Sequence, residues 1–295
     1  MAPGNQLLWG TFPAIVTPFS DDGSRVDFDS FKELLDFQIA HGVSGVVVCG
    51  STGETATLSE DEYRDVVSFA RNYVGSRAAV IAGIGANSTK RAVELAAFLE
   101  SVGVDGILLV TPPYNKPTQN GLLAHFAAVR AAVDTPIIAY NVPGRTGVNL
   151  LPKTVGRLAD EGLIAGLKES SGSIDQVLDI VSLVGSRIAL LSGEDSLIHA
   201  TMASGGVGAV SVVANVDPAL VVRITAAALK EEWRGARDAQ LQMLPLARAV
   251  FTETNPIPIK AALWLKGLIR YPTTRLPLTP AEPQTIELLK RVLAL

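Results

Sequence analysis

The stretch PIIAYNVPGRTGVNLLPKTVGRLADEGLIAGLK, residues 136–168, contains the pattern that decides the fold. It begins with the apolar run Pro136–Tyr140, continues through an amphipathic segment from Leu151 to Asp160, and ends with an apolar run that reaches Lys168. Continuous apolar runs are typical of strands in parallel sheets, because helices cover both faces of such sheets. The stretch therefore predicts a strand–helix–strand unit with parallel strands.

The same unit recurs along most of the chain. Apolar runs begin at Phe12, Gly45, Ala79, Gly106, Pro136, Ile164, Ile188 and Gly208. The helical patterns between and after them are Phe28–Ala40, Glu60–Tyr73, Ser88–Ser101, Gly121–Ala132, Leu151–Asp160, Ile174–Leu183, Ser196–Ala203 and Pro218–Glu232. Eight consecutive units predict an α/β protein with a closed (β/α)8 barrel, the TIM-barrel fold.

The alternation of strands and helices stops near residue 233. The remaining sequence is predicted to form helices, interrupted by Asn255-Pro-Ile-Pro258 and by the segment Tyr271–Pro283, which is rich in Pro and Thr. We therefore predict two regions: a barrel with the catalytic site at 1–232, and a C-terminal helical region at 233–295.

Composition favours a small-molecule partner over a nucleic acid or a membrane. The 295 residues include 25 Lys and Arg against 29 Asp and Glu, a formal charge of −4, and no long block of like charge. Cys49 is the single cysteine, and His41, His125 and His199 lack the spacing of metal ligands, so we expect no disulfide, metal or cofactor. The N-terminus does not resemble a signal peptide, and no apolar run reaches about 18 residues. We expect a cytoplasmic protein.

In a barrel of this kind, the active site is built at the C-terminal ends of the strands. The sequence places candidate groups at five such ends. They are Ser51 and Thr52 after the second strand, Tyr114 after the fourth, Tyr140 and Arg145 at and after the fifth, Lys168 at the end of the sixth, and Glu194 with Asp195 after the seventh.

Lys168 is the candidate nucleophile. Strand alternation can point its side chain either into the barrel or out towards the helices. If the amine is buried, desolvation lowers its pKa and leaves a neutral group that attacks carbonyls. The alternative is a structural ion pair with a carboxylate such as that of Glu169.

The other candidates also have alternative interpretations. Ser51 and Thr52, flanked by glycines, offer hydroxyl and N–H donors suited to a carboxylate, but such residues are also common in ordinary turns. Tyr140 transfers a proton if it is hydrogen-bonded to Ser51 or Tyr114, and is otherwise a packing residue. Arg145 either binds a substrate carboxylate or forms a surface ion pair.

Five motifs together resemble the dihydrodipicolinate synthase family, which shares a superfamily with N-acetylneuraminate lyases. They are Gly50-Ser-Thr-Gly-Glu54, Thr111-Pro-Pro-Tyr-Asn-Lys-Pro117, Tyr140-Asn-Val-Pro-Gly-Arg-Thr-Gly147, Gly166-Leu-Lys-Glu169 and Asn255-Pro-Ile-Pro-Ile-Lys260. Their order and spacing match the family over nearly the whole chain.

The resemblance implies a lyase that needs no cofactor, in which Lys168 forms an imine with pyruvate. The derived enamine attacks the aldehyde of aspartate semialdehyde and gives 4-hydroxy-tetrahydrodipicolinate, a precursor of lysine and diaminopimelate. Thr52 and the backbone near Val210 are implied to bind the pyruvate carboxylate. Tyr140 is implied to donate and accept protons, and Arg145 to bind the carboxylate of the second substrate.

The resemblance also implies an oligomer. In the family, a hydroxyl relay joins the positions of Tyr140 and Ser51 to a tyrosine of a neighbouring subunit, here Tyr114. We therefore expect a homotetramer, a dimer of dimers, whose other partners are pyruvate and an aldehyde.

Two departures from the family pattern bear on function. Ser51 stands where synthases usually have threonine, so the hydroxyl is kept but its rotamer is less restricted. Glu60, Arg91 and Pro113 stand where lysine-inhibited members tend to have His, Glu and Tyr. We expect weak or absent inhibition by lysine.

Two alternatives remain open. The imine chemistry also suits another pyruvate-dependent aldolase or sugar-acid lyase, of the hydroxy-oxoglutarate, 2-keto-3-deoxy sugar acid or neuraminate type, although these relatives usually lack the arginine found at position 145. A catalytically silent small-molecule-binding protein could also keep the fold. Substrate assays separate the first alternative from the synthase, and covalent trapping with pyruvate separates the second.

Overall fold

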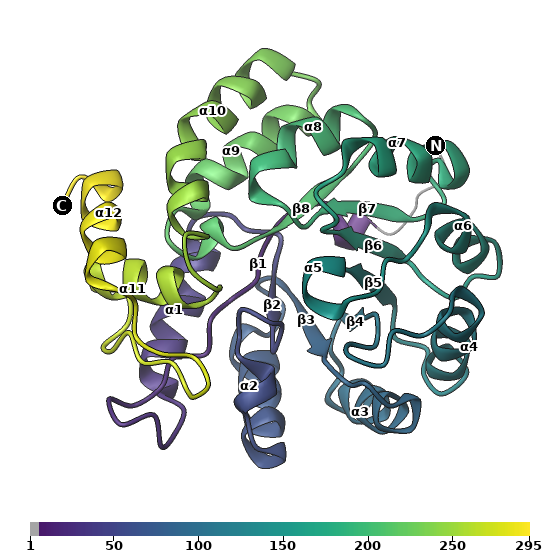
Figure 1. The fold of residues 1–295 in the computed structure, drawn as a ribbon, viewed down its shortest axis with the longest axis horizontal. Helices are drawn as coiled ribbons and strands as arrows, with labels where there is room; N and C mark the ends of the chain where they lie inside the picture. The colour runs from purple at the N-terminus through teal and green to yellow at the C-terminus, as the bar shows by residue number, and fades with distance from the viewer. Residues whose placement is uncertain (1–5) are drawn as a thin grey trace.

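Eight parallel strands form a barrel surrounded by helices in the computed structural model, which describes residues 6–295 (Figure 1). The strands are β1 (Gly10–Pro13), β2 (Gly45–Val48), β3 (Ala79–Ile84), β4 (Gly106–Val110), β5 (Ile137–Asn141), β6 (Gly166–Glu169), β7 (Ala189–Ser192) and β8 (Gly208–Ser211). Each strand from β2 to β7 pairs with the next in sequence, and β8 pairs with β1. A bridge between Ala14 and Val47 joins β1 to β2, so the predicted barrel is confirmed.

The helices of the barrel follow the predicted order. They are α1 (Phe28–Ala40), α2 (Glu60–Val74), α3 (Thr89–Val102), α4 (Gln119–Arg130), α6 (Pro152–Asp160), α7 (Ile174–Val184), α8 (Ile198–Ala203) and α9 (Pro218–Leu229). Helix α4 begins at Gln119 rather than Gly121, because the Thr118 side chain caps it by accepting a hydrogen bond from the Gly121 N–H. The sequence analysis does not anticipate α5 (Pro143–Thr146), a single turn after β5.

Two apolar layers result from the alternation of side chains along the strands. The interior of the barrel is filled by side chains that include Phe12, Val47, Ile81, Leu108, Ile138, Leu191 and Val210. The alternate strand residues, such as Leu167 and Leu190, pack outward against the helices. Because Leu167 faces outward, its neighbour Lys168 faces the interior.

Three further helices follow the barrel: α10 (Trp233–Ala249), α11 (Ile257–Leu265) and α12 (Pro283–Leu293). Helix α10 packs beside α8 and α9, and α12 packs against α10 and α11 (Figure 1). The Gln240 side chain connects α10 to the barrel, since it accepts from the His199 N–H and donates to the Asp195 carbonyl. Between residues 6 and 295, no helix is long and apolar enough to cross a membrane.

A buried ion pair joins α11 to the turn after β2. Lys260 and Glu54 pair with side chains 0% and 1% exposed. The Lys260 ammonium also donates to the Thr273 carbonyl at 2.8 Å and lies 4.0 Å from the centre of the Phe19 ring. Burial lowers the pKa of Lys260 to about 8, although the Glu54 carboxylate opposes this shift.

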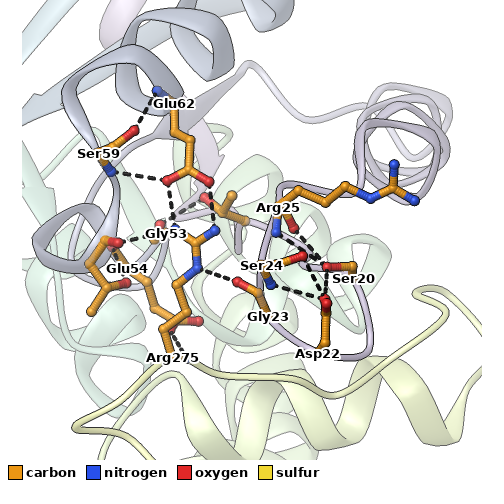
Figure 2. Close-up of polar contacts among 12 residues, drawn as sticks. Ser20, Asp22, Gly23, Ser24, Arg25, Gly53, Glu54, Ser59, Glu62 and Arg275 are labelled. Atoms are coloured by element: carbon orange, nitrogen blue, oxygen red, sulfur yellow. Dashed lines mark hydrogen bonds and ion pairs between the residues drawn. The ribbon is translucent and has the colours of Figure 1, made fainter.

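Arg275 extends this connection to α2. Its guanidinium donates two hydrogen bonds of 2.6 Å to the Glu62 carboxylate, and its backbone N–H donates to Glu54 at 3.0 Å (Figure 2). The Arg275 guanidinium also donates to the Gly23 carbonyl, which lies in the loop after β1. These hydrogen bonds hold the segment between α11 and α12 against the connection between β2 and α2.

Substitution of the buried lysine tests the contribution of the pair. Lys260→Met is expected to lower the free energy of unfolding by about 3–5 kcal/mol, because the Glu54 carboxylate is left buried without its cation. The double variant Glu54→Gln/Lys260→Met should recover part of this loss. Urea unfolding at neutral pH measures both. The control, Lys290→Met, removes an exposed pair with Glu287 and should change stability little; an equal loss in both single variants would contradict the argument.

Candidate active site

Lys168 and Tyr140 face each other inside the barrel. They are register partners on β6 and β5, and their side chains are buried, at 6% and 7% exposure. The Lys168 Nζ lies 4.0 Å from the centre of the Tyr140 ring. An amine at this distance from a phenol ring is placed for cation–π contact and, after small rotations, for proton exchange with the hydroxyl.

The Glu169 carboxylate points to the other side of β6. It accepts hydrogen bonds from the Asn141 side chain at 3.0 Å, from the Ser171 N–H at 2.7 Å and from the Gln176 side chain at 3.3 Å. Within the described residues Lys168 has no ion pair. The alternative pairing of Lys168 with Glu169 is therefore not formed, because adjacent residues of a strand face opposite ways.

The end of β7 supplies space and negative charge beside the lysine. A Cβ atom at Gly193 would lie 3.0 Å from both Cγ and Cε of Lys168, so a larger residue would collide with the lysine. Burial raises the pKa of the next residue, Glu194, and the adjacent Asp195 carboxylate raises it further, while Lys168 opposes the shift. The side chain of Lys168 therefore lies close enough to the carboxyl groups of Glu194 and Asp195 to influence them.

Asp195 itself organises the turn after β8. Its buried carboxylate accepts from the N–H groups of Val212 and Val213 at 2.9 and 3.1 Å and from the Ser211 hydroxyl. Burial raises the pKa of this carboxyl, and these donors oppose the shift. The chain next to Val210, which itself lies in the barrel interior, is thereby held in place.

Ser51 and Thr52 lie in a tight turn after β2. The Gly53 N–H donates to the Gly50 carbonyl at 3.0 Å, and Thr52 is buried. The Thr52 hydroxyl accepts a hydrogen bond of 2.9 Å from the side chain of Asn255, far along the chain. This contact orients the hydroxyl of the turn.

Asn255 also holds Arg145. The guanidinium, on the short helix α5, donates to the Asn255 backbone carbonyl at 3.0 Å. A cavity of about 290 Å³ is lined by Ser51, Arg145 and Asn255 among others, and a smaller one of about 30 Å³ by Ser51 and Tyr140 among others. Ser51 lines both, so the larger cavity beside Arg145 and the smaller one beside Tyr140 are neighbours.

Tyr114 lines neither of these two cavities. Its side chain is 89% exposed, and its backbone, with φ of 72°, is held by donation of its N–H to the Thr146 carbonyl. Among residues 6–295, no hydrogen bond joins the Tyr140 hydroxyl to Ser51 or Tyr114. The hydroxyl relay therefore stays a prediction.

Two of the three residues expected to bear on lysine inhibition, Glu60 and Arg91, form an ion pair. Arg91 pairs with Glu60 at 2.9 Å, and Arg64 pairs with the same carboxylate at 2.8 Å. Pro113 lines the 290 Å³ cavity. Glu60, an exposed carboxylate, is thus engaged by two arginines.

The largest cavities do not lie at the mouth of the barrel. Two larger hollows, of about 750 and 730 Å³, lie beside the loop Ser20–Asp29 and between α4, α6 and α7. Neither is lined by the predicted site residues, whereas the barrel mouth combines a buried amine with hydroxyl and guanidinium groups. In the described residues, no three His, Cys, Asp or Glu side chains form a group that could hold a metal. We assign the site by its chemistry.

The contacts of Asn255 could not be predicted from the sequence. There, Asn255-Pro-Ile-Pro258 is an interruption between helices and one of the motifs of the family resemblance. The only signal available is an uncharged polar residue before proline, which many loops share. Its two contacts, to Thr52 and Arg145, depend on tertiary structure.

The assembled groups suit covalent chemistry on a keto acid. A buried amine can add to a ketone, a neighbouring phenol can transfer protons, and the hydroxyl turn and the guanidinium can bind two carboxylates.

Comparison with known proteins agrees with this chemistry. The model of the dihydrodipicolinate synthetase family matches residues 7–294. The chain is 47% identical to the 4-hydroxy-tetrahydrodipicolinate synthase of Geobacter metallireducens over 274 residues, which cover 93% of each protein.

Solved structures of similar sequence have the same fold. The dihydrodipicolinate synthase of Thermotoga maritima superposes with a TM-score of 0.94 at 42% identity, over 97% of each chain. The chloride-inhibited enzyme of Acinetobacter baumannii, complexed with pyruvate, gives 0.95 at 39% identity, over 97% of this chain and 98% of that one. These matches confirm the resemblance read from the sequence: the chain belongs to the dihydrodipicolinate synthetase family.

Proposed function

We propose that the protein is a 4-hydroxy-tetrahydrodipicolinate synthase, an imine-forming lyase that condenses pyruvate with L-aspartate 4-semialdehyde. The observation that carries the proposal is the buried Lys168 amine, which lies against Tyr140 and has no carboxylate partner in the described chain. Relatives with this name and the pyruvate complex of a similar enzyme support the choice of reaction and first substrate.

The reaction begins at the Lys168 amine. The amine adds to C2 of pyruvate, and the resulting carbinolamine loses water to give an imine. Loss of a proton from C3 gives an enamine, whose C3 attacks the aldehyde carbon of the second substrate. The amino group of that substrate then attacks the imine carbon, closes the ring and releases Lys168. Tyr140 donates and accepts the protons of these steps.

The two substrate carboxylates have separate binding groups. In our proposal, the pyruvate carboxylate binds at Thr52, whose hydroxyl is oriented by Asn255, and at the backbone next to Val210. Arg145 binds the carboxylate of the aldehyde in the cavity of about 290 Å³ that it lines. The Asn255 carbonyl occupies only part of the guanidinium, which leaves donors for a substrate.

A related pyruvate-dependent aldolase or sugar-acid lyase is the alternative, because Lys168, Tyr140 and the turn after β2 would serve either reaction. The position of Arg145 beside the cavity favours a second substrate that carries a carboxylate. A catalytically silent protein would have no use for a buried lysine kept free of ion pairs.

We further propose a cytoplasmic homotetramer, a dimer of dimers, in which Tyr114 completes the hydroxyl relay of a neighbouring subunit. The 89% exposure of Tyr114 supports this, since a side chain that serves a neighbouring subunit must project away from its own chain. The pairing of Glu60 with Arg91 supports weak or absent inhibition by lysine, because it leaves that carboxylate engaged.

Covalent trapping tests the proposed nucleophile. Borohydride treatment with pyruvate is expected to add one reduced pyruvyl group to the protein, at Lys168, as measured by intact-protein and peptide mass spectrometry. Lys168→Ala should give no adduct and lose more than about 10³-fold in turnover. Lys153→Ala, at an exposed lysine, should trap normally. Trapping that persists in Lys168→Ala would refute the assignment.

Arg145→Ala tests the second substrate. We expect kcat/KM for aspartate semialdehyde to fall by roughly 10- to 150-fold, since a hydrogen-bonded charge contributes about 1.5–3 kcal/mol. Pyruvate trapping should be intact. Steady-state kinetics with the aldehyde varied measures the effect. If turnover of the aldehyde were unchanged, Arg145 would not bind it; an adduct without turnover in the unmodified protein would favour the aldolase alternative.

Subunit mixing tests Tyr114. Tyr114→Phe should lower turnover by about 10²-fold or more, the usual effect of losing a proton-transfer group. Coexpression with Lys168→Ala should restore part of the activity, because a hybrid site can combine Lys168 of one subunit with Tyr114 of the other. Tyr271→Phe coexpressed with Lys168→Ala is the control for dilution. Absence of restoration, in an oligomer shown to be mixed by mass spectrometry, would place Tyr114 outside the relay.

A further inference from the structure

Ser170 carries a buried hydroxyl that has no partner in the described chain. The residue is 8% exposed, and its Oγ accepts and donates no hydrogen bond. Its backbone is held, since its N–H donates to the Asn141 carbonyl at 2.9 Å. Because most buried hydroxyls are hydrogen-bonded, one left free next to an active site suggests that its partner is the ligand.

The hydroxyl lies on the same side of the chain as the nucleophile. Ser170 is two residues beyond Lys168, so both share the inward face, while Glu169 and Ser171 face the helices. The contacts agree: the Ser171 N–H donates to the outward Glu169 carboxylate.

Gly193 brings Ser170 and Lys168 together. The position of a hypothetical Cβ at Gly193 lies 1.8 Å from the Ser170 Oγ and 3.0 Å from the Lys168 Cε. Both atoms therefore occupy the space that a side chain at residue 193 would take. Strand β6 pairs with β7, and the Gly193 N–H donates to the Glu169 carbonyl at 2.8 Å, so this glycine lies beside the end of β6.

The arrangement of the strands indicates which atom of the substrate Ser170 meets. β6, which carries Lys168, stands four strands away from β2 around the eight-stranded barrel, so the two are opposite. The Lys168 side chain and a pyruvate bonded to it would extend together from β6 towards Thr52. Because C2 is bonded directly to Nζ, the oxygen on C2 would lie closer to the β6–β7 side than the carboxylate does.

We propose that Ser170 is a further catalytic residue, whose hydroxyl hydrogen-bonds to the oxygen on C2 of pyruvate during imine formation at Lys168. This inference rests on the proposed function and deepens it. When Nζ bonds to C2, the carbonyl π electrons move to oxygen, and Tyr140 transfers one proton from the nitrogen to that oxygen. When the C–O bond then breaks, the nitrogen lone pair forms C=N, Tyr140 transfers the second nitrogen proton, and the oxygen leaves as water. Ser170 stabilises the oxygen in both steps and transfers no proton of its own.

The rate of imine formation with pyruvate alone tests the proposal. Ser170→Ala is compared with the matched control Ser171→Ala, which removes the outward-facing hydroxyl of the adjacent residue. Rapid mixing with pyruvate, borohydride quenching at timed intervals and intact-protein mass spectrometry give the rate constant. We expect Ser170→Ala to form the adduct about five- to tenfold more slowly, the effect of one hydrogen bond, and to reach full occupancy of Lys168. Ser171→Ala should match the unmodified protein.

A conservative variant separates the hydroxyl from packing. Ser170→Thr keeps the hydroxyl and is expected to form the adduct within about twofold of the unmodified rate. A loss in Ser170→Thr equal to that in Ser170→Ala, or an unchanged adduct rate in Ser170→Ala with slower overall turnover, would overturn the proposal. Absence of any adduct in the unmodified protein would instead refute the proposed function itself, so the two failures are distinguishable.

Discussion

The buried ion pair between Glu54 and Lys260 is the contact on which the geometry of the site depends. Glu54 ends the turn that carries Ser51 and Thr52, and Lys260 lies on α11, five residues after Asn255. A charge pair removed from water keeps its free energy only with close geometry and further hydrogen bonds, here from Arg275 and to Thr273. Because a small shift of the C-terminal region would leave a buried charge unpaired, the ion pair holds that region in one position.

The position of the C-terminal region matters because Asn255 lies only five residues before Lys260. From there, its side chain orients the Thr52 hydroxyl and its carbonyl holds the Arg145 guanidinium. Two groups that follow different strands are therefore aligned by a residue from outside the barrel strands. The helical region after α9 is in this sense part of the candidate site, and its packing through Gln240 onto Asp195 adds a second attachment near β7 and β8.

The barrel supplies the other half of the site through strand alternation. In β6 it directs Lys168 inward and Glu169 outward, so the amine is buried with no ion pair among the described residues, while the carboxylate accepts from Asn141 and Gln176. A lysine that forms no ion pair keeps its amine available to add to a carbonyl group. The absent side chain at Gly193 leaves the room that such a lysine requires.

The sequence by itself determined the fold and the family. Eight apolar runs separated by amphipathic segments require a parallel sheet covered on all sides, and the motifs around Lys168, Tyr140 and Arg145 indicate the chemistry. The tertiary structure alone decided which way Lys168 faces, since an apolar run does not show which of its two faces lies inside a barrel. It alone revealed the contacts of Asn255 and Asp195 and the lack of a partner for the Ser170 hydroxyl in the described residues, because barrel closure and the docking of the C-terminal helices decide which residues come together. Hydrophobic periodicity is a local property of the chain, whereas the pairing of buried polar groups depends on distances that only the closed barrel sets.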